Sequence, residues 1–254
     1  MRTLFRLLPS LLCALMLLSL SACGLIPPGM LQPAPSPGAQ AGSSGGECAN
    51  SYFPVIQGAK WIYTASGHFS GTLSRTITSV AADGFTDQHT SPAGGAQSMQ
   101  WDCSDGIIAR QPETAPSGLI PAGDLVADLH TTDTSGVTVP DNLGPGAKWN
   151  QESTLDGTAS IGGQSAPAHD DITTDCSASS HDSVPVPAGT FMALRADCRT
   201  DETITVTLNG SPITTKIITM ATIWYAPGVG MVKLEQAVSG GDKTTFELAS
   251  YYIP

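Results

Sequence analysis

The stretch Thr203-Ile204-Thr205-Val206-Thr207-Leu208-Asn209-Gly210 decides the fold class of this 254-residue chain. Threonine and apolar residues alternate with period two, which is the period of a β-strand with one buried face. Asn209-Gly210 follows directly and favours a type I′ turn, because both central positions of that turn need a positive φ. The run from Ile213 to Trp224 then predicts the returning strand of a hairpin.

The same pattern continues through most of the chain after residue 47. Only Pro121 to His130 suggests a helix, and a short one. We therefore predict an all-β fold made of antiparallel β-meanders. Further strands are predicted at residues 61–66, 73–80, 98–103, 106–110, 190–198, 230–236 and 244–252.

Three landmarks occur twice in the same order. Their ordered recurrence predicts two tandem related halves, residues 48–115 and 140–254, that form one curved sheet, a half-barrel or a sandwich. The alternative is convergence, since such turns and Trp-bearing strands are common in β proteins. The first landmark is Gly58-Ala59-Lys60-Trp61, which returns as Gly146-Ala147-Lys148-Trp149. The second is Ser79-Val80 followed by Asp83-Gly84-Phe85, which resembles Ser183-Val184 followed by Ala188-Gly189-Thr190-Phe191. The third is Trp101 followed by residues 106–110, which resembles Trp224 followed by residues 230–233.

The N-terminus has the three parts of a signal peptide. Arg2 and Arg6 form a basic start, residues 7–20 are mostly apolar, and small residues precede Cys23. The apolar part is shorter than the roughly 20 residues of a spanning helix. Leu20-Ser21-Ala22-Cys23 resembles the bacterial lipobox, in which the cysteine thiol is acylated before cleavage makes it the new N-terminus. We expect a signal peptide at 1–22 and a lipid anchor on Cys23; the alternative is an ordinary secretory signal and a soluble, secreted protein.

The residues after Cys23 have the composition of a tether. Five prolines between residues 27 and 37 favour an extended polyproline II segment, and the Gly/Ser-rich residues 42–46 favour a flexible coil. Residues 23–47 are therefore predicted to be a lipidated tether, and residues 48–254 a β-rich domain.

Four cysteines remain in this domain: Cys48, Cys103, Cys176 and Cys198. An even number in an exported domain indicates two disulfides. Among the three possible pairings we favour Cys48 with Cys103 and Cys176 with Cys198, one bridge in each half of the chain.

The charge of the chain argues against nucleic acid as a partner. Two of the 11 basic residues lie in the leader, so nine of them face 22 acidic residues, which is a formal charge of −13. Binding to phosphates needs a basic surface, and no basic cluster is present in the sequence.

Catalytic, metal and cofactor motifs are missing from the sequence. The histidines, expected to be solvated loop residues, lack zinc spacing, and Asp170, Asp171 and Asp175 lack the spacing of a calcium loop. No carboxylate pair stands out for glycoside hydrolysis, although such pairs meet in space rather than in sequence. We expect no catalytic residue, no metal and no cofactor. The histidines are His68, His89, His130, His169 and His181.

Four tryptophans invite a sugar-binding platform, because aromatic faces stack on sugar rings. All four nevertheless fall on the repeated landmarks, which favours a role as anchors of the core. They are Trp61, Trp101, Trp149 and Trp224.

Three segments together resemble a group of uncharacterised bacterial lipoproteins. They are Tyr52-Phe53-Pro54 with Gly58 and Trp61-Ile62-Tyr63, residues 186–191 (Val-Pro-Ala-Gly-Thr-Phe), and residues 224–233 (Trp-Tyr-Ala-Pro-Gly-Val-Gly-Met-Val-Lys). The resemblance spans residues 52–253 and implies a fold and a location rather than an activity. Some proteins of this class resemble curved half-barrels that carry lipids, but this chain lacks the helices that would cover their concave face.

These features together predict a membrane-anchored bacterial lipoprotein, on the extracytoplasmic face of the cell membrane or the outer membrane. Its β-domain is expected to be non-enzymatic and to bind a partner or an envelope component. The alternative is a carrier or sensor of a hydrophobic ligand in a β-cleft, and a weaker alternative is a cell-envelope hydrolase.

Overall fold

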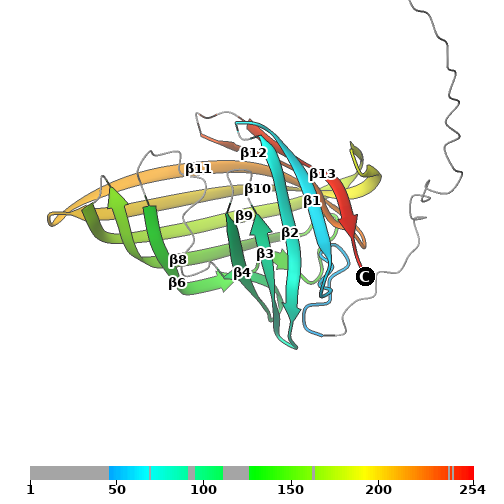
Figure 1. Ribbon diagram of the computed structural model, residues 1–254, viewed down its shortest axis with the longest axis horizontal. Helices are drawn as coiled ribbons and strands as arrows, with labels where there is room; N and C mark the ends of the chain where they lie inside the picture. The colour runs from blue at the N-terminus through cyan, green and yellow to red at the C-terminus, as the bar shows by residue number, and fades with distance from the viewer. Residues whose placement is uncertain are drawn as a thin grey trace, which may run out of the picture. The chain divides into compact units, whose positions relative to one another are not determined.

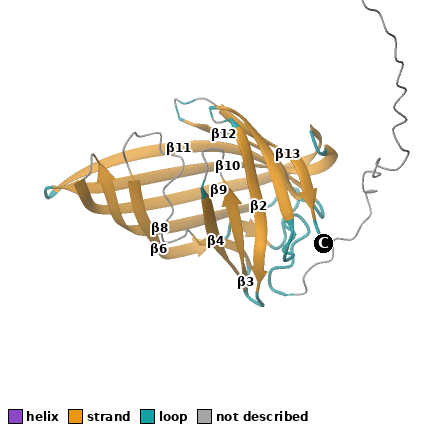
Figure 2. Ribbon diagram, viewed as in Figure 1, coloured by secondary structure: helices purple, strands orange, loops and turns teal. Residues whose placement is uncertain are grey.

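The computed structural model describes residues 46–68, 70–90, 95–110, 126–161, 164–239, 241 and 243–254. In these ranges the structure contains strands and no helix, which confirms the all-β class (Figure 2). The strands are β1 Lys60–Gly67, β2 Gly71–Val80, β3 Gly84–Thr90, β4 Ala96–Cys103, β5 Gly106–Arg110, β6 Val126–Gly136, β7 Val139–Pro140, β8 Lys148–Ile161, β9 Gln164–Val186, β10 Gly189–Leu208, β11 Ser211–Ala226, β12 Gly230–Val238 and β13 Lys243–Tyr252.

The described strands form one antiparallel sheet in the order β6-β8-β9-β10-β11-β12-β13-β1-β2-β3-β4-β5-β7. The long strands β8 to β11 run along one part of the sheet, and β1 to β4 run steeply across their direction in the view of Figure 1. The sheet curls enough to bring β9 into contact with β12 and β13. The amide of Ala188, in the β9–β10 turn, donates a hydrogen bond to the carbonyl of Leu248 on β13 at 2.9 Å. The prediction of one curved sheet is therefore confirmed.

The predicted strands are present, but several strands were missed. Residues 190–198 and 203–208 are parts of one strand, β10. The polar strands β3 and β8 were not predicted, and of β9 only a hairpin strand near Cys176 was expected. β9 is rich in Ser, Thr and Asp, and it forms a strand because β8 and β10 pair with both of its edges. The prediction of a short helix at residues 121–130 was wrong for residues 126–130, which belong to β6. Residues 121–125 lie outside the described residues.

The β10–β11 hairpin has the predicted turn. Leu208 pairs with Ser211, and φ is 52° at Asn209 and 79° at Gly210, so both turn residues have the positive φ of a type I′ turn.

The buried residues form two clusters on one face of the sheet, which we call the inner face. The larger cluster contains Trp61, Tyr63 and Leu248, and the smaller one includes Leu155 and Ile204 on the long strands. Trp61 and Trp101 are buried, as predicted for core anchors. Trp149 and Trp224 are only half-buried at the border of the larger cluster, so the core prediction holds for them only in part.

The two Gly-Ala-Lys-Trp segments have the same local structure. The glycine φ is 85° at Gly58 and 83° at Gly146. In each segment the glycine amide donates to a carbonyl of the next strand, and the residue there donates back to the alanine carbonyl, at 2.8–2.9 Å. Gly58 and Ala59 exchange these bonds with Ile77, and Gly146 and Ala147 exchange them with Ala178. The relation between the two halves stays a prediction, which this shared geometry supports.

Strand pairing can be used to compare the position of Trp101 in the first half of the proposed repeat with positions in the second half. From Ile77 the ladder leads through Asp87 to Met99, and Trp101 lies two residues further along β4. From Ala178 the ladder leads through Ala196 to Ile223, and Tyr225 lies two residues further along β11. Counted along the ladders, Trp101 therefore lies at the position of Tyr225, which is also buried, whereas the landmarks in the sequence place Trp101 beside Trp224.

Both predicted disulfides are present. Cys48–Cys103 ties the segment before β1 to the end of β4, and Cys176–Cys198 joins directly opposite residues of β9 and β10. The bridges span 55 and 22 residues. Cys23 lies outside the described residues, as do the leader and nearly all of the tether.

Candidate functional site

A row of side chains around Trp224 crosses the sheet at the border of the larger buried cluster, against which Trp224 packs. Trp224 pairs with Arg195 on β10 and with Lys233 on β12, and Lys233 pairs with Glu247 on β13. Because side chains alternate along a strand, burial of Tyr225 on the inner face places Trp224 on the outer face. We call these four residues, together with Asp182, Asp197 and Glu235, the Trp224 patch.

Two contacts hold the indole of Trp224 in place. Its Nε1 donates a hydrogen bond to Oδ2 of Asp182 at 3.1 Å. Nζ of Lys233 lies 5.4 Å from the centroid of the indole ring, within the range of a cation–π interaction. The side chain is half-buried, so one fixed aromatic surface lies among charged groups.

The charges around Trp224 are paired with one another. Arg195 Nη2 lies 2.9 Å from Asp197 Oδ1, and this hydrogen-bonded partner raises the pKa of Arg195. Lys233 lies 3.0 Å from Glu235 and 3.6 Å from Glu247. Partial burial opposes ionisation of Glu235, but hydrogen bonds from Lys243 and Lys233 lower its pKa overall. The patch is therefore polar, and its two basic and four acidic side chains give it a formal charge of 2 − 4 = −2.

The Trp224 patch has the chemistry of a recognition surface. Trp and Arg are enriched among the residues that contribute most to protein interfaces, and a charged rim provides orientation and specificity.

A pair of carboxyl groups, Asp170 and Glu202, lies on the inner face. Burial and the neighbouring Glu202 raise the pKa of Asp170 to about 7, and burial also raises the pKa of Glu202. Asp170 pairs with Ile204 and Glu202 pairs with Ile172, so the two acids are diagonal neighbours across the β9–β10 ladder. The sequence missed the pair because its residues are 32 positions apart and only the β9–β10 register brings them together.

The calcium grouping considered from the sequence is divided between two faces. Asp170 is buried on the inner face, whereas Asp171 and Asp175 are exposed on the outer face. Among the described residues, no group of three or more His, Cys, Asp or Glu side chains could hold a metal ion.

The histidines were predicted to lie in loops, and this was wrong for four of the five, because only His68 lies outside a strand. His169 on β9 contacts Asp156 at 2.7 Å and Asp171 at 3.2 Å, and the hydrogen bond to Asp156 raises its pKa. His181, also on β9, lies 2.9 Å from the hydroxyl of Tyr52. His89 on β3 lies 3.0 Å from the buried Asp87, and His130 lies on β6.

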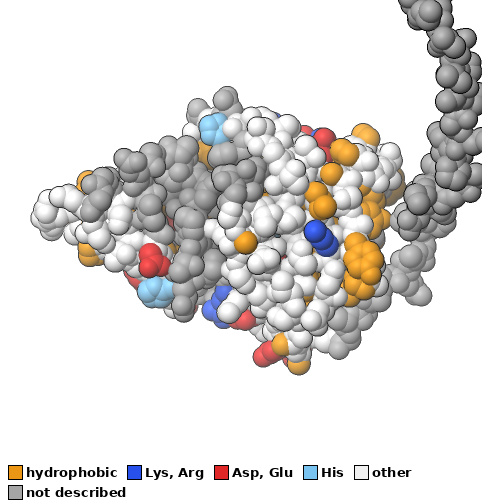
Figure 3. All heavy atoms as spheres, viewed as in Figure 1, with side chains coloured by type: hydrophobic (Ala, Val, Ile, Leu, Met, Phe, Trp, Pro, Cys, Tyr) orange, Lys and Arg blue, Asp and Glu red, His pale blue; other side chains and the backbone are white. Residues whose placement is uncertain are grey.

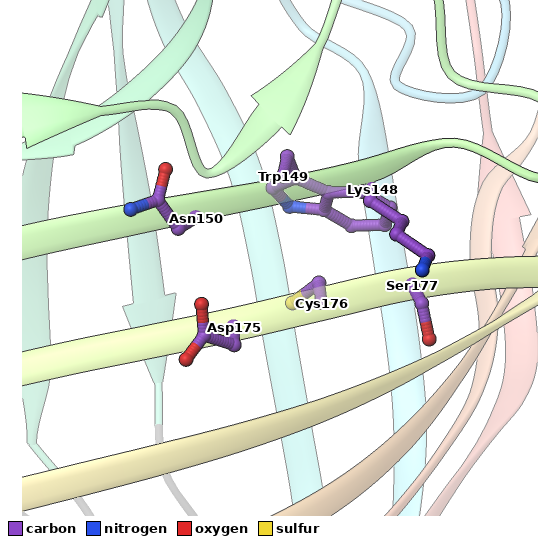
Figure 4. Close-up of a pocket in the computed structure, with 6 residues that line it drawn as sticks. All are labelled: Lys148, Trp149, Asn150, Asp175, Cys176 and Ser177. Carbon is purple, nitrogen blue, oxygen red and sulfur yellow. The ribbon is translucent and has the colours of Figure 1, made fainter.

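A shallow depression between β8 and β9 is lined by Lys148, Trp149, Asn150, Asp175, Cys176 and Ser177 (Figure 4). These residues form three directly opposed pairs. By strand alternation the exposed Lys148, Asn150, Asp175 and Ser177 mark its corners, and the backbone between them forms its floor. A second depression lies further along β8 and β9 and is also lined by Asp133 and Ser135 of β6. Neither is an enclosed ligand cavity.

Large exposed hydrophobic side chains are few among the described residues: Met192, Ile213, Met220 and Tyr252. On the face seen in Figure 3, hydrophobic side chains gather toward the end where β1 and β13 lie, and charged side chains are sparse. In the described part of the chain, no helix is long and apolar enough to cross a membrane.

No protein family model matches the chain, and no curated protein sequence matches it. Among solved structures, the chain is similar to one described as a lipoprotein from Parabacteroides distasonis, with 15% identity and a TM-score of 0.46 over 81% of this chain and 99% of that chain. It is similar to an exported protein with a YmcC-like fold from Bacteroides fragilis, with 17% identity and a TM-score of 0.46 over 80% and 100% of the two chains. It is also similar to the lipoprotein YmcC from Escherichia coli, with 9% identity and a TM-score of 0.30 over 76% and 83%.

Proposed function

We propose that this chain is a bacterial lipoprotein with a non-enzymatic extracytoplasmic β-domain, which binds a protein partner or an envelope component through the Trp224 patch. The observation that carries the binding role is the half-buried Trp224, held by Asp182 and flanked by Arg195 and Lys233. A fixed aromatic side chain loses little conformational entropy when a partner covers it, and the surrounding ion pairs provide orientation.

The location rests on three features of different kinds. The lipobox around Cys23 supports acylation, and the Pro- and Gly/Ser-rich segment after it suits a tether. Two disulfides suit an oxidising compartment outside the cytoplasm. The cell membrane and the outer membrane are both consistent with these features.

Fatty-acid labelling in cells tests the anchor. A clickable fatty acid is expected to label the wild-type chain, and Cys23→Ala is expected to lose the label and leave the membrane fraction. A wild-type chain without label would contradict the anchor and support the ordinary secretory signal.

Site-specific photo-crosslinking of the full chain in its host tests the binding surface. A photoreactive residue at Thr222, beside Trp224 on the same face, is expected to give a discrete adduct, and Trp224→Ala is expected to reduce its yield severalfold. The matched control places the photoreactive residue at Asn150, which is exposed on the outer face of β8. Equal crosslinking yields at Thr222 and Asn150, unaffected by Trp224→Ala, would show that the Trp224 patch is not the binding surface.

The second apolar cluster favours one alternative function. Leu129, Leu155, Ile204 and Val206 are buried on the inner face of the long strands, separate from the larger cluster. A carrier or sensor could hold a hydrophobic ligand against such a surface. Native mass spectrometry of the purified chain would show a stoichiometric bound lipid in that case, and a ligand-free chain would leave the partner-binding function.

A further inference from the structure

Two acidic side chains meet on the inner face without a cation to neutralise them. Asp170 pairs with Ile204, and Glu202 pairs with Ile172, so the two acids are diagonal neighbours across the β9–β10 ladder. Diagonal neighbours lie within reach of long side chains. Every Lys and Arg after the leader belongs to the described ranges, and none of them forms an ion pair with either acid.

The surroundings of this pair disfavour ionisation. Asp170 is only 2% exposed, and its Oδ1 has no hydrogen-bond partner. Leu155 on β8 and Ile204 on β10 pair with Asp170 from either side. An isolated carboxylate in an apolar environment is costly, so such groups usually keep a proton instead.

The strands around the pair contribute no other titratable group on the inner face. The only titratable neighbours on β9 are His169, which lowers the pKa of Asp170, and Asp171, which raises it. Both lie on the outer face, where His169 also contacts Asp156. The inner-face residues next to the pair are Leu129 and Thr131 on β6, Ser153, Leu155 and Gly157 on β8, and Thr215, Ile217 and Thr219 on β11.

We propose that Asp170 and Glu202 share one proton and form a pH-sensitive element, which stabilises the long-strand part of the sheet while the proton is bound and weakens it when both acids are ionised. The proton forms the O–H···O bond between the two carboxyl groups, and its loss leaves two like charges in contact on an apolar surface. This element is independent of the Trp224 patch on the other face.

The direction of the pH effect follows from linkage. The pKa of Asp170 is raised from 3.8 to about 7, so the folded chain binds more protons than the unfolded chain between these values. The stabilisation is complete below the unfolded pKa and is lost as the pH rises through the folded pKa. One such group raises the unfolding equilibrium constant by up to about tenfold per pH unit within this window.

Urea unfolding of the full chain in detergent, between pH 5 and 8, tests the proposal. Asp170→Asn keeps the shape and the hydrogen bond but does not titrate. We expect the unfolding constant of the wild type to rise with pH by up to about tenfold per unit relative to this variant. Asp175→Asn on the outer face of the same strand is the matched control and is expected to follow the wild type.

A second variant and a spectroscopic measurement make the test decisive. Glu202→Gln is expected to flatten the pH dependence in the same way, so it replaces Asp170→Asn if that variant does not fold. The infrared C=O stretch of a protonated carboxyl group is expected in the wild type at pH 6 and not at pH 9. Parallel pH profiles for the wild type and the folded variants, or no protonated carboxyl at pH 6, would overturn the proposal.

Discussion

Arg75 is a charged residue in the aromatic part of the core. Its guanidinium lies 4.3 Å from the ring centroid of Phe53 and 5.2 Å from that of Trp61, and its Nε contacts Asp87 at 2.5 Å. Asp87 is fully buried, and its pKa is lowered overall, because hydrogen bonding from His89 and the charge of Arg75 outweigh the opposing effect of burial. The period-two pattern places residue 75 on a strand, but it does not indicate that a cation belongs in the core.

Removing this cation should destabilise the domain strongly. Arg75→Met leaves the buried Asp87 carboxylate with His89 but without its permanent cation, at an expected cost of about 3–5 kcal/mol in the free energy of unfolding. Arg110→Met is the control, because the Arg110–Asp102 pair is more than 40% exposed on both sides and should contribute about 0–1 kcal/mol. Urea unfolding measures both values, and equal losses would show that the buried pair has no special role.

The pKa of His169 should be raised in solution. The hydrogen bond with Asp156 contributes most to raising this pKa, and the charge of Asp171 raises it further. The resulting stabilisation is complete below the unfolded pKa of His169 and is lost as the pH rises through its folded value. Titration of the imidazole by NMR should give a pKa above 6.5, and Asp156→Asn should lower it. A normal pKa in the wild type would contradict the observed contacts.

At the scale of the elements, β6 and β8 approach each other closely at Gly157. A Cβ atom at this position would overlap the backbone carbonyl oxygen of Asp128 on β6. Gly157 therefore allows the two strands to pair at this point, although its φ is not unusual.

Gly157→Ala should push β6 away from β8 and cost about 1–3 kcal/mol, the usual range for overpacking. Gly144→Ala is the matched control, since the nearest atom to its Cβ would be the carbonyl oxygen of Asn142 at 3.8 Å, an ordinary contact. Thermal unfolding compares the two variants. A Gly157→Ala protein as stable as the control would mean that the strands can separate locally without cost.

At the scale of the whole molecule, β13 connects the early and late parts of the chain. It lies between β12 and β1 in the sheet, and its Leu248 is fully buried in the larger cluster. The last strand in the sequence is thus a central strand of the sheet, where both edges are paired.

A chain truncated before Lys243 should fail to fold, because β12 and β1 lose their common partner and the larger cluster loses Leu248. Removal of Pro254 alone is the control, because this residue follows β13 and is exposed. Near-UV circular dichroism of the soluble fraction measures the outcome. A truncated chain with a native spectrum would show that the two parts fold without β13.

Local patterns in the sequence predicted the all-β class, most strands and the turn at Asn209-Gly210, because alternation and turn chemistry are local properties. The sequence left three cysteine pairings possible, and the structure confirms the one that we favoured. The tertiary structure was needed for the full length of β9, for the half-buried position of Trp224 and for the diagonal placement of Asp170 and Glu202. These depend on strand register and on the curl of the sheet. Side chains far apart in sequence become neighbours only after strand pairing has set that register, and no local pattern encodes it.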